Sequence, residues 1–125
     1  MLAVDSSALI AYLAGETGGD VDAVDMALQS KQAALPPVVL CELLSDPKLP
    51  ARVIRALKHF PLLALSEGFW ERAGLLRARV IAQGRKARLA DALIAQTCLD
   101  HDIPLITRDR DFRHFARLSS LQLLP

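Results

Sequence analysis

The chain has 125 residues and a formal net charge of +1, and 52% of its residues are hydrophobic. This length is enough for one buried core and too short for two, so we expect a single domain over residues 1–125. No apolar run approaches the roughly 20 residues of a membrane span, and no basic leader precedes the first apolar run. Membrane proteins and secreted proteins are therefore disfavoured, and we expect a cytoplasmic protein with no membrane contact. Some of the surplus apolar surface is expected to face a partner.

Short apolar runs alternate with helical segments in the first part of the chain, which is typical of an α/β fold with a parallel sheet. Strands are expected at residues 2–4 and 33–36. Helices are expected at residues 7–14, at residues 21–28 after an N-cap at Asp20, at residues 37–45 and, after a break at Asp46 and Pro47, at residues 50–59.

The alternation continues to the end of the chain. Further strands are expected at residues 62–65, 104–107 and 121–124. Helices are expected at residues 67–83 with Ser66 as N-cap, at residues 87–100, and at residues 111–116. Cys41 and Cys98 lie among apolar residues of these helices, so both are expected to be small buried side chains, not a disulfide or a metal pair.

Four acidic residues interrupt four apolar stretches of the sequence: Asp5 in MLAVDSSALI, Glu42 in PPVVLCELLS, Asp91 in RLADALIAQTCL and Asp109 in IPLITRDRDF. Carboxylates are rarely buried unless they are paired or bind a metal. Asp5 and Asp109 follow predicted strands, where open α/β sheets bind their ligands. Four acids in such settings suggest that they gather at one site.

A gathering of carboxylates narrows the chemistry. Two carboxylates about 4 Å apart repel by roughly 4 kcal/mol at an effective dielectric near 20. A divalent cation relieves that repulsion at neutral pH, and all-oxygen ligands select Mg²⁺ or Mn²⁺. Such a site can activate water and hydrolyse a phosphodiester. The hydroxyls of Ser6 and Thr107 are expected to orient Asp5 and Asp109.

Each acid also has a purely structural alternative. Asp5 could cap the following helix through its side chain, and Asp91 could pair with Arg88 one helical turn earlier. Asp109 and Asp111 could be ordinary loop or capping residues. Four independent coincidences are less probable than one shared site.

The small net charge hides an asymmetry. Residues 1–46 hold seven acids and Lys31, a balance of −6, whereas residues 47–125 hold fourteen Lys and Arg and seven acids, a balance of +7. One stretch contains cations without any acid: Arg72, Arg77, Arg79, Arg85, Lys86 and Arg88. This stripe could follow a phosphate backbone or be a solvated helix face.

The sequence resembles PIN-domain ribonucleases and, among them, the VapC-type toxins of bacterial toxin–antitoxin pairs. The segments that carry the resemblance are VDSSALIAYLAGE, LPPVVLCELL, LADALIAQTC and PLITRDRDF, in this order over nearly the whole chain. The resemblance implies a three-layer α/β/α sandwich with acids converging at the C-terminal edge of a mainly parallel sheet.

The resemblance also implies a function. Asp5, Glu42, Asp91 and Asp109 match the family's catalytic and metal-site acids, and Asp111 matches a less regular fifth ligand. The implied activity is endonucleolytic RNA cleavage with Mg²⁺ or Mn²⁺ by metal-activated water. A homodimer and a cognate antitoxin protein are expected partners, and the candidate RNA contacts are Arg85, Lys86, Arg88 and Arg108.

Other functions remain open from the sequence alone. The same fold could cleave DNA or process RNA without acting as a toxin. A non-catalytic metal-binding module, such as a phosphoacceptor receiver domain, is disfavoured because no lysine follows Lys86. The RNA target and the number of metal ions are not encoded in any motif.

Overall fold

Four parallel strands in the order β2-β1-β3-β4 form the centre of the computed structural model, which describes residues 1–124. The strands are β1 (Leu2–Val4), β2 (Ala33–Ala34), β3 (Leu105–Ile106) and β4 (Leu123–Leu124). β1 pairs with β2 on one side and with β3 on the other, and β4 pairs with β3. The predicted parallel α/β sheet is confirmed.

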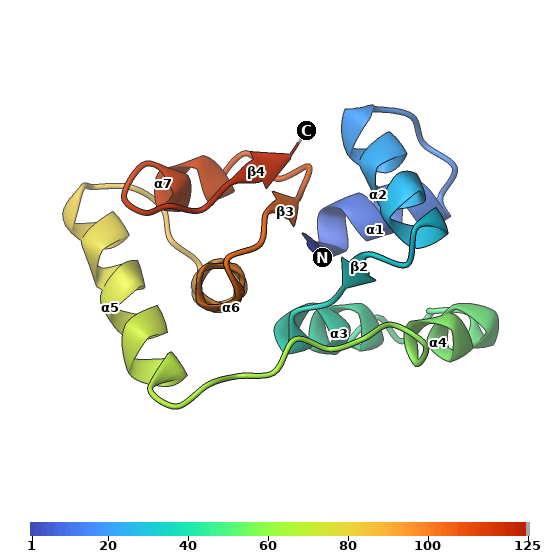
Figure 1. The fold of residues 1–125 in the computed structure, drawn as a ribbon, viewed down its shortest axis with the longest axis horizontal. Coiled ribbons are helices and arrows are strands. Elements are labelled where there is room, and N and C mark those ends of the chain that lie inside the picture. The colour runs from blue at the N-terminus through green and yellow to red at the C-terminus, as the bar shows by residue number, and fades with distance from the viewer. Residues whose placement is uncertain (125) are drawn as a thin grey trace.

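Helices cover both faces of this sheet. They are α1 (Ser6–Leu13), α2 (Gly19–Gln29), α3 (Pro37–Leu44), α4 (Ala51–Leu57), α5 (Phe69–Ala82), α6 (Leu89–His101) and α7 (Phe112–Ala116). α1 and α2 lie on one side of the strands, and α3 and α6 lie on the other, with α5 packed outside α6 (Figure 1). The predicted three-layer arrangement is confirmed. Among the described residues, no helix combines the length and apolarity needed to span a membrane.

The strand predicted at residues 62–65 is wrong. Only Leu62 forms an isolated parallel bridge, to Leu35 beside β2. Both Leu62 and Leu65 are exposed, at 49% and 39%. An inner strand of a parallel sheet is covered on both faces. This segment instead lies at the edge of the sheet, where the amide of Leu63 donates to the carbonyl of Leu35 and the amide of Leu35 donates to the carbonyl of Pro61, just before the segment.

Two predicted helix N-caps are also wrong, because glycine makes the turn in both cases. α2 is capped by Gly18 and α5 by Gly68, not by Asp20 and Ser66. Gly18 has φ +144° and Gly68 has φ +80°, backbone conformations that side-chain-bearing residues rarely adopt. Asp20 therefore falls inside the first turn of α2, where its carboxylate is available for another contact.

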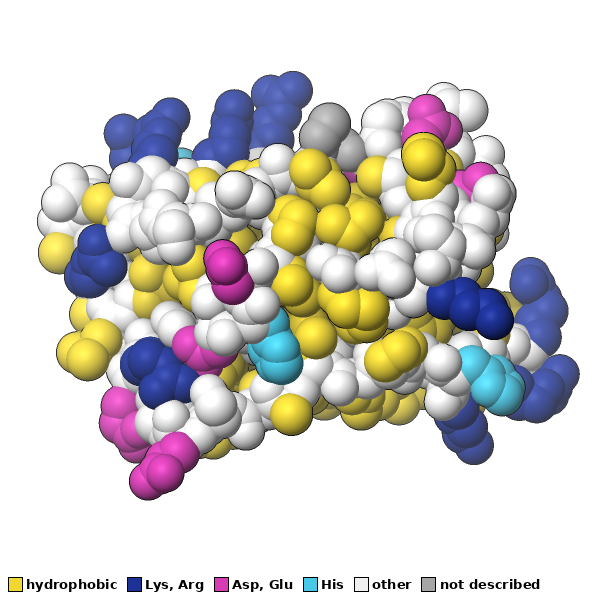
Figure 2. Space-filling model, viewed as in Figure 1, with side chains coloured by type: hydrophobic (Ala, Val, Ile, Leu, Met, Phe, Trp, Pro, Cys, Tyr) yellow, Lys and Arg dark blue, Asp and Glu magenta, His cyan; other side chains and the backbone are white. Residues whose placement is uncertain are grey.

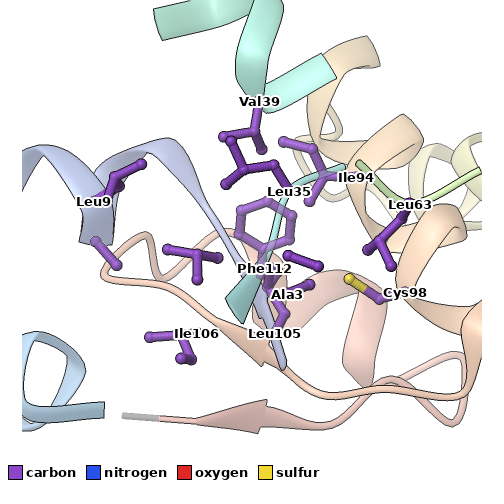
Figure 3. Packing of buried hydrophobic residues seen from close by; sticks show 14 of the residues in the cluster. Ala3, Leu9, Leu35, Val39, Leu63, Ile94, Cys98, Leu105, Ile106 and Phe112 are labelled. Carbon is purple, nitrogen blue, oxygen red and sulfur yellow. The ribbon is translucent and has the colours of Figure 1, made fainter. Parts of the chain in front are cut away.

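The core joins the sheet to the helices that carry the acidic residues. Leu105 of β3 is fully buried in the same cluster as Leu9 of α1, Val39 of α3, Ile94 of α6 and Phe112 of α7 (Figure 3). Each such side chain contributes about 1.5–3 kcal/mol through burial. The helices are therefore fixed relative to the C-terminal ends of β1 and β3.

The two cysteines differ. Cys98 is fully buried in α6, as predicted, and burial raises the pKa of its thiol to about 12. The prediction that Cys41 is buried is wrong, because its side chain is exposed. α3 buries Val39 and Leu43, and a residue halfway between two positions four apart lies on the opposite face of a helix.

Candidate acidic site at the end of the sheet

Asp5 stands where β1 ends. Its amide donates to the carbonyl of Ile106 at 2.9 Å, and Val4 is paired in register with Ile106, so the residues that follow β1 and β3 lie side by side. Asp5 occupies the N-cap position of α1, but its side chain makes no capping hydrogen bond. The helix-cap alternative is therefore confirmed for the position of Asp5 and wrong for its side chain, because the carboxylate, only 3% exposed, makes other contacts.

Two hydroxyl groups hold one oxygen of Asp5. Ser7 Oγ donates to Asp5 Oδ2 at 2.6 Å, and Thr107 Oγ1 donates to the same oxygen at 2.8 Å. A hydroxyl has one proton to give, so both oxygens act as acceptors toward other groups. Ser7 Oγ accepts from the amide of Arg108 and Thr107 Oγ1 accepts from the amide of Asp109, both at 3.0 Å. The orientation of Asp5 is thereby tied to the backbone that follows β3.

Three further carboxylates meet beside this network. One oxygen from each of Asp91, Asp109 and Asp111 lies within 4.8 Å of the others. Asp91 is in the first turn of α6 and is 5% exposed. Burial raises the pKa of Asp91, and the charges of Asp109 and Asp5 raise it further, while Arg88 lowers it.

Glu42 reaches the same region from α3. Ser6 Oγ donates to Glu42 Oε1 at 3.3 Å. The pKa of Glu42 is raised, chiefly because its carboxyl group is partly buried and next because of the negative charge of Asp5. The charge of Asp91 raises it further. Ser6 and Arg88 oppose it. Because the charge of Asp5 raises the pKa of both Glu42 and Asp91, these acids form one electrostatic cluster.

Arg88 balances part of the negative charge. Its Nη2 lies 2.7 Å from Asp109 Oδ2, and its Nε lies 3.3 Å from Asp91 Oδ2. Lys86 Nζ is a looser neighbour, 3.9 Å from Asp111 Oδ2. The Arg88 side chain is 55% exposed, and ion pairs at such sites contribute up to about 1 kcal/mol. The predicted alternative of an Arg88–Asp91 pair is thus present, but Arg88 makes its shorter contact with Asp109.

The acids singled out from the sequence are brought together at one end of the sheet, while their catalytic and metal-binding roles stay predictions. The assignment of Ser6 to Asp5 is wrong. Ser7 makes that contact, and Ser6 turns to Glu42 instead. Two serines follow Asp5, and only their phase on α1 distinguishes them, which is why sequence reasoning missed Ser7.

Arg108, a candidate RNA contact, is engaged elsewhere. Its Nε lies 2.8 Å from Asp20 Oδ2, its Nη1 lies 3.2 Å from Glu16 Oε1, and its Nη2 donates to the carbonyl of Thr17 at 2.9 Å. The hydrogen bond from Arg108 is the main cause of the lowered pKa of Asp20. Arg108 therefore fastens the segment between α1 and α2 to the end of β3.

Comparison with known proteins identifies the family. The model of the PIN domain family matches residues 2–118, and the chain therefore belongs to the PIN domain family. No curated protein gives a significant sequence match.

Solved structures share the fold. VapBC2 from Rickettsia felis, bound to a promoter DNA fragment, matches with a TM-score of 0.73 and 18% identity over 98% of this chain and 96% of that chain. FitAcB from Neisseria gonorrhoeae matches with a TM-score of 0.72 and 18% identity over 100% and 97%. A toxin–antitoxin complex from Klebsiella pneumoniae matches with a TM-score of 0.66 and 27% identity over 90% of both chains. The predicted resemblance to VapC-type PIN proteins is confirmed at the level of family and fold.

Thr107→Val tests the hydroxyl network. The substitution keeps the shape of the side chain but removes the donor to Asp5 and the acceptor for the Asp109 amide, so we expect a loss of about 1–3 kcal/mol in the free energy of unfolding. The matched control is Thr97→Val in α6, another buried threonine whose hydroxyl donates only to the carbonyl of Leu93. Urea unfolding measures both variants. Equal losses would show that Thr107 has no special part in holding the site.

Proposed function

We propose that this chain is a Mg²⁺- or Mn²⁺-dependent endoribonuclease and the toxin of a toxin–antitoxin pair. The observation that carries the proposal is the convergence of five carboxylates from four segments of the chain on the C-terminal end of a parallel sheet: Asp5, Glu42, Asp91, Asp109 and Asp111. Membership of the PIN domain family and similarity to VapBC and other toxin–antitoxin structures support it.

The side chains present fit a hard divalent cation. All donors are carboxylate oxygens, and those of Asp91, Asp109 and Asp111 are close enough to share one ion. These three would hold the metal, with Asp5 beside them. When bound, the ion would supply a Lewis acid that activates water and stabilises charge on the phosphodiester.

Asp5 and Glu42 are suited to different tasks. Two hydroxyls fix Oδ2 of Asp5 from the protein side, so this carboxylate is preorganised and needs no reorientation. Glu42 is exposed, its pKa is raised, and its Oε2 makes no hydrogen bond within residues 1–124. A raised pKa makes a carboxylate a better proton acceptor near neutral pH. We therefore assign Glu42 Oε2 the task of positioning the attacking water or taking its proton.

An apolar groove on the surface supports the proposal that an antitoxin protein binds this chain. Two adjoining hollows of about 550 Å³ and 220 Å³ lie between α1, α2 and α4, and both are lined by Leu28, Ala56 and Phe60. Leu13 of α1, at the edge of the smaller hollow, is 41% exposed. We propose that an amphipathic helix of the cognate antitoxin fills this groove. The expected homodimer stays a prediction.

Cleavage of total cellular RNA by antitoxin-free protein is the direct test. We expect discrete cuts with Mg²⁺ or Mn²⁺, none with EDTA, and a loss of about 100-fold or more in Asp5→Asn. Asp22→Asn, the same chemical change at an exposed position of α2, should cleave like the wild type. Cleavage at the wild-type rate by Asp5→Asn would refute the site. Cleavage of DNA without RNA would favour the DNA alternative.

Metal affinity tests the charge balance of the cluster. Mn²⁺ should raise the unfolding temperature because it relieves carboxylate repulsion only in the folded state. Arg88→Ala removes a competing cation from Asp91 and Asp109, so we expect apparent Mn²⁺ affinity by calorimetry to rise about fivefold. Arg85→Ala is the matched control, since Arg85 forms no ion pair among the described residues. Equal affinities in the two variants would show that Arg88 does not compete with the metal.

Ala56→Glu tests the groove. Ala56 is exposed on α4 and lines both hollows, so a charged side chain there should weaken binding of the co-expressed antitoxin by about tenfold or more while RNA cleavage is unchanged. Ala78→Glu places the same charge on the exposed face of α5 as a control. Undiminished antitoxin binding by Ala56→Glu, measured by calorimetry, would place the partner on another surface.

A further inference from the structure

The run of cations between Arg72 and Arg88 does not form a free phosphate track in the fold. Arg72 Nη2 is paired with Asp100 at 2.7 Å, Arg77 Nε donates to the carbonyl of Ala87 at 2.8 Å, and Arg79 Nη2 donates to the carbonyl of Leu118 at 2.5 Å. Arg88 is bound to the acid cluster. Most guanidinium groups of this stretch therefore already hold parts of the chain together.

A different set of cations is left on the surface, on and beside α7. Phe112 and Phe115 of this helix are fully buried. Arg110, Arg113 and Arg117 are exposed, and their spacing of three and four residues puts them on the opposite face. None of these three forms an ion pair within residues 1–124. We call Arg110, Arg113 and Arg117 the α7 ridge.

The α7 ridge is continuous with the acidic site. Arg110 stands in the sequence between Asp109 and Asp111. A hollow of about 360 Å³ is lined by Asp109, Arg110 and Arg113 together with Leu123 and Leu124 of β4. Figure 2 shows Lys and Arg side chains gathered along the edge of the molecule that α7 occupies in Figure 1, and a second group at the opposite end, around α4.

We propose that the α7 ridge binds the sugar–phosphate backbone of the RNA and leads the strand to the acids. This inference rests on the proposed ribonuclease function. Arg113 Nε donates one long hydrogen bond, of 3.3 Å, to the carbonyl of Arg110, and this contact leaves the two terminal nitrogens of Arg113 for a ligand. Guanidinium groups without an ion pair bind phosphate oxygens well, and their place beside Asp109 and Asp111 balances the repulsion that these carboxylates exert on a polyanion. Contacts of this kind are made to phosphates and not to bases, so the ridge supplies affinity without sequence preference.

The test compares two triple variants in the Asp5→Asn background, in which we expect RNA to be bound but not cut. The ridge variant carries Arg110→Ala, Arg113→Ala and Arg117→Ala. The matched control carries Arg52→Ala, Arg55→Ala and Lys58→Ala, three exposed cations on α4 and at its C-cap. Both variants lose three positive charges, so the comparison shows whether the place from which the charge is removed matters. Circular dichroism checks that both variants are folded.

The readout is the salt dependence of binding to a single-stranded RNA. Each phosphate contact contributes about 0.7 to the slope of log affinity against log salt. We expect the ridge variant to lose about 2 units of slope and about tenfold or more in affinity near 100 mM salt, with little change in the α4 control. Equal losses in both variants, or no loss in the ridge variant, would overturn the proposal. A lower affinity of the ridge variant for duplex DNA, with its affinity for the RNA unchanged, would also overturn it.

The same substitutions in the active protein separate this proposal from the ribonuclease function. If the wild type cleaves RNA and the ridge variant cleaves it with an unchanged KM, the ridge proposal fails and the ribonuclease stands. If the wild type does not cleave RNA but the ridge variant alone loses RNA binding, the ridge stands and the ribonuclease fails. A raised KM with kcat preserved at saturating RNA supports both.

Discussion

The register of β1 against β3 is the constraint on which the site depends. Because Val4 is paired with Ile106, the chain leaves both strands at the same edge, and Asp5 meets Thr107 although 102 positions separate them. A slip of one residue would turn Asp5 to the opposite face of the sheet. Strands of two or three residues form few hydrogen bonds, so the register is held mainly by buried side chains, among them Leu105.

The strand register brings several negative carboxylates together, and their mutual repulsion must be offset. The protein offsets it with two kinds of group, which differ in how firmly the fold holds them. The hydroxyls on Asp5 are short, largely buried contacts, whereas Arg88 is a half-exposed side chain that bridges Asp91 and Asp109. The compensation is incomplete, because burial and like charges still raise the pKa of both Glu42 and Asp91. A fold that keeps such unrelieved charge beside a replaceable cation is suited to an ion that arrives from solution.

The meeting of the acids and the approximate positions of the four strands could be predicted from the sequence because both have local signals. These signals are an acid inside an apolar run and a short apolar run before a turn. Features that depend on side-chain partners distant in the chain could not be predicted. Arg108 pairs with Asp20, 88 positions away, and no spacing rule relates them. The run at residues 62–65 is apolar enough for a strand, but only the fold shows that helices do not cover both of its faces.

Which cations remain free at the surface is the feature that the sequence predicts least well. A run of cations without neighbouring acids in the sequence can still meet acids and carbonyls in space, as Arg72 meets Asp100. The charge available to a polyanion is what remains after these internal contacts are made. On α7 it remains because two phenylalanines take the inner face. A helix of five residues is not stable alone in water, so the buried Phe112 and Phe115 that stabilise α7 also fix its outward-facing cations relative to Asp109.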